Sequence, residues 1–335
     1  MAEAATTTRC RTFDCSVIPA PCDDNRHTLP SGHYNNYNNC HRDHPMPSDA
    51  LVEELITADG YRLSTCRFPA QGPLQGRLIV AGATAVPQGF YRRFAQHAAA
   101  RGFETLTFDY RGIGRSAPAS LKGFRMDLLD WARQDLAAAV DAMAQDDVPL
   151  YLVGHSYGGH AFGLLPNHAK VAGFYVFGTS AGWYGYMPPL ERLKVLTMWK
   201  LVLPVLTWWK GYCPWSALGL GEDLPRDVYR QWRHWCSLPH YFFDDPAMRG
   251  IEVGFAAVRT PIVAVNALDD LWATPQSRDA FMQAYRNTDL QREDLDPRQH
   301  GGAIGHMGYF RASAEPLWDR ALDWFAGLPR ATHTN

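Results

Sequence analysis

A serine in a glycine-rich turn is the residue best suited to nucleophilic chemistry in this sequence. The run Gly-His-Ser-Tyr-Gly-Gly occupies residues 154–159, after the apolar run PLYLVG and before a stretch that can form a helix. A Gly-x-Ser-x-Gly turn between a strand and a helix needs small glycines at its sharp corner, and it leaves the serine hydroxyl exposed above the sheet. We therefore expect Ser156 to be a nucleophile, the alternative being a structural serine in a turn.

A serine hydroxyl needs a general base, and the base needs a carboxylate that orients it. Both partners are expected downstream of the serine. The expected base is His306, in the Gly-His-Met-Gly loop before the last helix, with His300 as its nearest competitor. The acid should follow the strand expected at 260–267, where Asp269 and Asp270 are adjacent candidates. The aspartate that does not face the base is expected to cap a turn or to be solvated.

Acyl transfer also requires backbone N–H groups that stabilise an oxyanion. One donor should be the amide of Tyr157, directly after the nucleophile. The other is expected in the loop Ala-Gly-Ala-Thr at 81–84, where Ala83 is the preferred donor and Thr84 the next choice. The alternative is that this loop is only a tight turn.

Alternating apolar runs and helical periods indicate the framework that positions these residues. Strands that alternate with helices favour a mainly parallel sheet covered on both faces. Residues 50–179 and 256–330 are therefore expected to form an α/β core. The expected strands are a hairpin around the turn at 58–60, then 77–82, 104–110, 149–154, 171–178 and 260–267, and the expected helices are 91–100, 126–144, 276–286 and 314–326.

The alternation stops between residues 180 and 255, which we interpret as an inserted helical lid. Seven of the 11 Trp residues fall between positions 183 and 235. These aromatic side chains are expected to pack the lid on the core or to line an apolar substrate pocket, with packing as the main role. The apolar stretch VLTMWKLVLPVLTWW contains Lys200 and Pro204 and is too interrupted to span a bilayer, although an interfacial helix remains open.

Composition limits the classes of partner. The formal net charge is -2, with 32 basic and 34 acidic side chains, and gives no electrostatic reason to expect nucleic acid. Residues 1–49 have no apolar period and are expected to be disordered, and Met46 is a candidate start of the native protein. Cys40, His41 and His44 match no standard zinc spacing, so we expect no metal and no organic cofactor. Without an export signal, the seven cysteines are expected to be reduced thiols in the cytoplasm.

Three motifs carry a resemblance to a known family: FDYRGIGRS at 108–116, VGHSYGGH at 153–160 and IGHMGYFR at 304–311. With these motifs the sequence resembles the α/β-hydrolase superfamily over residues 50–327. It is most similar to bacterial predicted α/β-hydrolases related to serine aminopeptidase-like and lysophospholipase-like proteins. The resemblance implies a triad of Ser156, Asp270 and His306, with Asp269 as the alternative acid. It also favours structural support as the role of Arg111.

One departure from the superfamily concerns the oxyanion loop, where many members carry His-Gly and this chain has Ala-Gly at 81–82. The glycine is kept and the donor is a backbone group, so the departure affects the shape of the oxyanion hole rather than the presence of a donor.

The expected activity is hydrolysis of a carboxylic ester or thioester through an acyl-enzyme, on a small molecule with an apolar acyl or aromatic group. A peptidase or an acyltransferase could use the same triad. A peptidase would need an acidic group for a peptide N-terminus, and the expected lid carries Glu191, Glu222 and Asp223. A non-catalytic ligand-binding protein is the alternative of another class. The sequence does not specify the oligomeric state.

Overall fold

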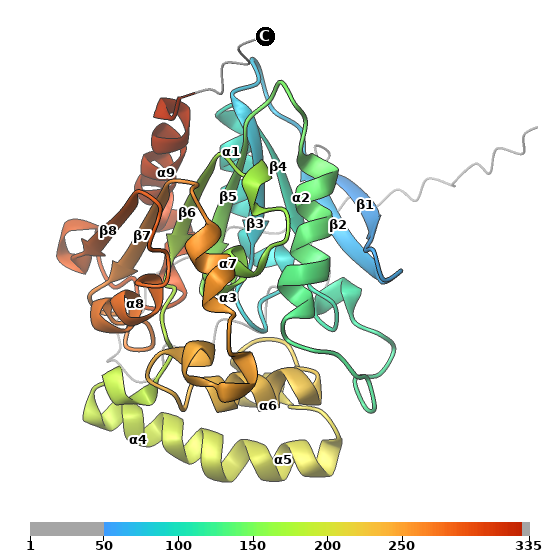
Figure 1. Ribbon diagram of the computed structural model, residues 1–335, viewed down its shortest axis with the longest axis vertical. Helices are drawn as coiled ribbons and strands as arrows, with labels where there is room; N and C mark the ends of the chain where they lie inside the picture. Colours follow the sequence, from blue (N-terminus) through green and yellow to red (C-terminus); the bar gives the residue numbers. More distant parts are fainter. Residues whose placement is uncertain (1–49, 330–335) are drawn as a thin grey trace, which may run out of the picture. The chain divides into compact units, whose positions relative to one another are not determined.

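The computed structural model describes residues 50–329, which contain one eight-stranded sheet (Figure 1). The strands lie in the order β1-β2-β4-β3-β5-β6-β7-β8. All strands from β3 to β8 run parallel, and β1 and β2 add an antiparallel hairpin at one edge. The strands are β1 (Leu51–Ile56), β2 (Arg62–Phe68), β3 (Gly76–Ala81), β4 (Phe103–Phe108), β5 (Leu150–His155), β6 (Gly173–Phe177), β7 (Ile262–Ala267) and β8 (Leu290–Leu295).

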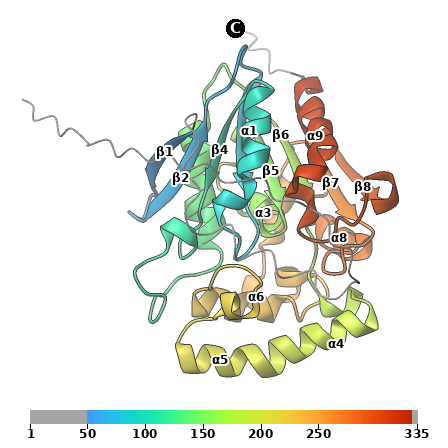
Figure 2. The same cartoon turned by 180° about the vertical axis from the view of Figure 1, so that it is seen from behind.

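Helices cover both faces of this sheet (Figures 1 and 2). On one face lie α1 (Arg92–Ala100) and α9 (Glu315–Gly327), and on the other lie α2 (Ala137–Met143), α3 (Tyr157–Ala161) and α8 (Pro275–Met282). Successive residues of a strand point to opposite faces, so Leu78 and Val80 join one buried cluster while Ile79 joins the other. Near-continuous apolar strands are what a parallel sheet buried on both faces requires. The expected α/β architecture is confirmed.

Two elements differ from the sequence expectation. The helix expected at 126–144 begins later, with a π-helical turn (Trp131–Leu136) that continues into α2. Strand β8, with the sequence LQREDL, was not expected, because four of its six side chains are polar. It lies at the edge of the sheet and pairs with β7 alone, which tolerates polar side chains that a central strand would not.

The connection from β6 to β7 is a helical insertion. It contains α4 (Pro189–Thr197), a π-helical turn (Met198–Val202), α5 (Leu203–Lys210), α6 (Arg226–Trp235) and α7 (Glu252–Ala257). α4 and α5 form one continuous rod on the side of the sheet where β5 leads into α3 (Figures 1 and 2). Val195, Trp199, Leu203 and Thr207 are buried at four-residue spacing, which gives the rod a single packed face.

Cys66, Cys213 and Cys236 are buried and form no disulfide among themselves. Over residues 50–329, no helix has the length and apolar character needed to cross a membrane. The expectations for residues 1–49, including disorder, the start at Met46 and the Cys and His residues near position 40, lie outside the described residues.

Candidate active site

Ser156 occupies the corner between β5 and α3. Its backbone has φ 51° and ψ −108°, a conformation that L-residues rarely adopt and that signals strain held by the surrounding fold. The corner is tight on both sides. A Cβ at position 158 would lie 2.1 Å from the Ala81 carbonyl oxygen, and one at position 159 would lie 1.8 Å from Thr179 Oγ1. Glycine is therefore required at positions 158 and 159.

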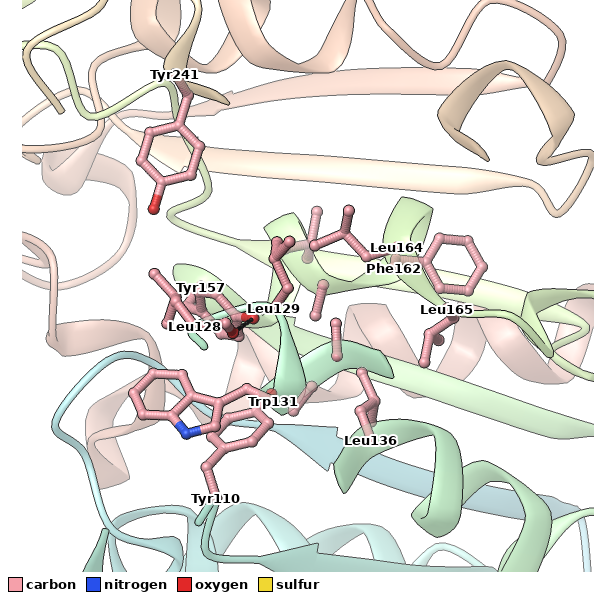
Figure 3. Close-up of a cluster of buried hydrophobic side chains, with 14 of the residues drawn as sticks. Tyr110, Leu128, Leu129, Trp131, Leu136, Tyr157, Phe162, Leu164, Leu165 and Tyr241 are labelled. Carbon is pink, nitrogen blue, oxygen red and sulfur yellow. Dashed lines mark hydrogen bonds between the residues drawn. The ribbon is translucent and has the colours of Figure 1, made fainter. Parts of the chain in front are cut away.

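The aromatic cluster under α3 fixes the start of this helix. Tyr157 is buried, its ring packs edge-on against Tyr110 and Trp131, and its hydroxyl donates to the Leu128 carbonyl oxygen at 2.8 Å (Figure 3). The side chain of Tyr157 thus points into the core. Its amide is the first of α3, and amides in the first turn of a helix have no intrahelical acceptor.

The structure brings Ser156, His306 and Asp270 together from three separate loops. Ser156 Oγ lies 3.0 Å from His306 Nε2, and His306 Nδ1 lies 2.9 Å from Asp270 Oδ2. The imidazole is partly exposed, whereas Asp270 is fully buried. This geometry allows a proton to pass from the serine to the imidazole while the carboxylate fixes the ring orientation.

Asp270 is held by further donors. Its Oδ1 accepts the amides of Trp272 at 3.1 Å and Ala273 at 2.9 Å, and its Oδ2 accepts the Tyr309 hydroxyl at 3.2 Å. A buried carboxylate is tolerated only when its oxygens are paired in this way.

The neighbouring Asp269 bonds to the backbone and has no bond to the imidazole. It accepts the amides of Ile304 at 2.9 Å and Gly305 at 3.0 Å, and so holds the loop that carries His306. Of the two aspartates, only Asp270 reaches the imidazole. The aspartate that does not face the base was expected to cap a turn or to be solvated. Asp269 instead accepts backbone amides of the separate loop that carries His306. His300 follows a 3₁₀ turn (Pro297–Gln299) and has no hydrogen bond to Ser156 or Asp270.

A hydrogen-bond relay that the sequence analysis missed connects the segment after β3 to the end of β5 and to the loop that carries His306. The Ala83 amide donates to Tyr91 Oη at 2.7 Å, Tyr91 Oη lies 2.9 Å from His155 Nδ1, and His155 Nε2 lies 2.8 Å from the His306 carbonyl oxygen. The carbonyl can only accept, so His155 Nε2 carries the proton and Nδ1 accepts the tyrosine hydroxyl. Burial, followed by the nearby His306, lowers the pKa of His155 to about 3, which keeps this imidazole neutral.

This relay bears on the oxyanion expectation for Ala83. Its amide is already bonded to Tyr91, so it can serve an oxyanion only by sharing or releasing that bond. The sequence offered one signal for this relay: a histidine, His155, at the end of an apolar strand, and a tyrosine, Tyr91, in the segment after β3.

Arg111 lies away from the serine and joins the edge hairpin to the π-helical turn. It bonds through Nε to Asp135 Oδ1 at 2.8 Å and through Nη1 to Asp59 Oδ2 at 2.6 Å. Trp131 Nε1 donates to the Arg111 carbonyl oxygen at 2.9 Å. These bonds agree with the structural role that the sequence favoured.

Two of the three acidic residues considered for a peptide amine, Glu191 and Asp223, are bonded to groups of the protein. Glu191 Oε1 accepts Trp272 Nε1 at 2.9 Å, and the Trp272 ring centroid lies 6.2 Å from that of His306. Asp223 accepts the amide and hydroxyl of Ser216. Over residues 50–329, no group of three or more His, Cys, Asp or Glu side chains is arranged to hold a metal ion.

The sheet order and the strand–serine–helix corner are those of the α/β-hydrolase fold. Residues 78–301 match the family described as serine aminopeptidase, S33, and the chain belongs to this family of hydrolases. A comparison with curated proteins finds no match.

Solved structures of the same fold cover most of the chain. Monoglyceride lipase from Saccharomyces cerevisiae, in complex with a substrate analogue, is 15% identical with a TM-score of 0.61, covering 84% of this chain and 98% of its own. Haloalkane dehalogenase from Bradyrhizobium elkanii is 13% identical with a TM-score of 0.58, covering 84% and 97%. The α/β-hydrolase GrgF from Penicillium sp. sh18 is 17% identical with a TM-score of 0.55, covering 83% and 98%. At these identities the similarity concerns the fold.

Proposed function

We propose that the protein is a serine hydrolase that cleaves a carboxylic ester or thioester through an acyl-enzyme. The observation that carries the proposal is the continuous hydrogen-bond chain from Asp270 through His306 to Ser156. Membership of a hydrolase family and the strained serine backbone support the same chemistry.

In the first step, Ser156 Oγ attacks the carbonyl carbon while His306 Nε2 takes its proton. The C–O or C–S bond then breaks, and the imidazolium returns the proton to the leaving alcohol or thiol. A water molecule attacks the acyl-enzyme with the same histidine as base, which releases the acid and regenerates Ser156. Asp270 holds the imidazole tautomer that presents Nε2 to the serine.

The amide of Tyr157 is the proposed first oxyanion donor, because it opens α3 next to the nucleophile. We propose the amide of Ala83 as the second, with its hydrogen shared between the oxyanion and Tyr91 Oη. Thr84 is the next donor along the loop.

Residues 180–255 are the proposed lid. The link from Glu191 in α4 to Trp272, whose ring neighbours His306, supports a position of the insertion beside the proposed site. Trp215 contacts both Trp232 and Trp272, with ring centroids 5.2 Å and 6.5 Å apart. Trp215 is buried in this packing, whereas Trp272 keeps partial exposure beside His306, and an aromatic ring in that position favours a substrate with an apolar acyl or aromatic group.

Aminopeptidase activity is the second candidate, because the family description names it. It would require a free carboxylate for the peptide amine. Glu191 accepts the Trp272 indole and Asp223 accepts the amide and hydroxyl of Ser216, so neither carboxylate is free for a peptide amine, which favours the ester hypothesis.

The test is labelling by a fluorophosphonate together with turnover of p-nitrophenyl esters of rising chain length and of amino acid p-nitroanilides. We expect wild-type protein to label and to hydrolyse the esters, and Ser156→Ala to do neither. Faster turnover of the p-nitroanilides than of the esters would favour the aminopeptidase. A wild-type protein that neither labels nor turns over any substrate would contradict a catalytic function and favour the ligand-binding alternative.

A further inference from the structure

The α4–α5 rod carries an exposed apolar face that the proposed chemistry does not use. Its packed side carries the four buried side chains Val195, Trp199, Leu203 and Thr207. On its other side, large apolar side chains face solvent, with Trp208 83% and Trp209 71% exposed. This outer face consists of Leu190, Leu193, Leu201, Val205, Trp208 and Trp209. An exposed apolar surface of this kind marks a site of interaction.

The charges on the rod indicate what the outer face contacts. Its exposed ionisable side chains are Lys194, Lys200 and Lys210, all basic. The one acidic side chain of the rod, Glu191, is largely buried: its Oε1 accepts the Trp272 indole, and its Oε2 lies 3.4 Å from Nζ of Lys194, whose side chain stays exposed. Exposed apolar residues flanked by lysines, without exposed acidic residues, complement a surface that is apolar inside and anionic at its headgroups.

The shape of the rod fits such a surface. Residues 189–210 form a continuous helical segment about 33 Å long at 1.5 Å per residue. It lies at the outer edge of the described fold, with α6 between it and the sheet (Figures 1 and 2). Tryptophan and lysine are side chains that settle at the headgroup level of a bilayer, since each has an apolar body and a polar end.

We propose that this outer face docks the protein flat on an anionic lipid surface. The contact is peripheral, with the apolar side chains between the acyl chains and the three lysines at the headgroups. It does not depend on the chemistry proposed for Ser156. The α4 helix is joined to the proposed site through the bond from Trp272 to Glu191, so docking brings the insertion and the serine to the same surface.

The experiment is flotation of the full chain with vesicles of phosphatidylcholine alone or with 30% phosphatidylglycerol. We expect the wild-type protein to bind the anionic vesicles, and to bind vesicles of phosphatidylcholine alone at least tenfold more weakly. A Leu201→Ser, Val205→Ser, Trp208→Ser, Trp209→Ser variant should lose binding, and a Lys194→Gln, Lys200→Gln, Lys210→Gln variant should bind at least tenfold more weakly. Matched controls change exposed residues elsewhere: Val253→Ser with Ile56→Ser, and Arg93→Gln with Arg133→Gln and Arg286→Gln. These controls and Ser156→Ala should bind like the wild type.

A second measurement does not depend on disruptive variants. Brominated lipids should quench the wild-type tryptophan fluorescence, and Trp208→Phe with Trp209→Phe should retain binding while losing most of the quenching. Three results would overturn the proposal: equal binding to both kinds of vesicle, no binding at all, or binding that is unchanged in both the fourfold serine variant and the threefold glutamine variant. Light scattering tests whether a second copy covers this face. A dimeric wild type and a monomeric fourfold variant (Leu201→Ser, Val205→Ser, Trp208→Ser, Trp209→Ser) would also overturn the proposal.

Discussion

At the scale of single residues, the two adjacent aspartates are separated by what their oxygens bond. Asp270 bonds the imidazole of His306, and Asp269 bonds the backbone of the loop before it. Sequence spacing alone could not decide between them, because a one-residue difference on a loop depends on backbone torsions that only the fold determines. The geometry makes the two roles separable by matched substitutions.

We predict that Asp270→Asn lowers kcat for an ester by about 10⁴-fold, because the amide favours the wrong imidazole tautomer. The matched Asp269→Asn variant should lose less than about tenfold in kcat, since asparagine still accepts one of the two loop amides. Steady-state kinetics on both variants tests this. Equal losses would contradict the assignment of the acid.

His155 is a buried, neutral histidine, and this has a consequence for acid stability. Its pKa is lowered to about 3 in the folded protein against about 6.5 when unfolded, so the unfolded chain binds the proton first as pH falls. Stability is therefore lost progressively from about pH 6.5 down to about pH 3. Between pH 7.5 and 5.0, titration of His155 alone lowers the free energy of unfolding by about 2 kcal/mol.

We predict that His155→Gln removes this contribution, because glutamine does not titrate. Urea unfolding at pH 7.5 and 5.0 should show a pH-dependent loss about 2 kcal/mol smaller in the variant than in the wild type. His160, whose pKa burial lowers to about 4, provides a second titrating group that the variant keeps. An unchanged pH dependence would show that His155 is not held neutral.

At the scale of elements, the corner around Ser156 depends on close approach rather than on loop flexibility. A Cβ at position 159 meets the side chain of Thr179, whereas a Cβ at Gly89 meets nothing within 4 Å. We predict that Gly159→Ala lowers the melting temperature and abolishes activity, while Gly89→Ala leaves both near wild type. Thermal unfolding with an ester assay checks both, and a tolerated Gly159→Ala would contradict the packing described.

The Arg111 network joins the turn of the edge hairpin to the π-helical turn that precedes α2. Removing the guanidinium leaves Asp135 buried without its ion-pair partner. We predict that Arg111→Ala costs about 3–5 kcal/mol of unfolding free energy, and that Arg111→Ala with Asp135→Ala costs less than the single change.

The exposed Arg62–Glu54 pair is the matched control for Arg111, and Arg62→Ala should cost at most about 1 kcal/mol. Urea denaturation measures all three variants. Similar values for Arg111→Ala and Arg62→Ala would rule out the anchoring role.

At the scale of the whole molecule, the sequence predicted the parallel core because its strands are apolar on both faces. Each run such as PLYLVG can only be buried, and the alternation with helices leaves few topologies. Strand β8 escaped because its polar side chains lie at an edge. The relay from Ala83 through Tyr91 and His155 to His306 was not predicted, because Tyr91 and His155 are 64 positions apart in the chain and His155 and His306 are 151 positions apart. Such contacts follow from the folded arrangement and have no local periodicity.

The central claim is that acyl transfer passes through Ser156. Its most direct test is acid quenching of the enzyme within its first turnover of a p-nitrophenyl ester, followed by peptide mass spectrometry. We predict a burst of about one p-nitrophenol per enzyme and the acyl mass on the peptide that contains Ser156. Turnover without an adduct at this serine, undiminished in Ser156→Ala, would contradict the claim.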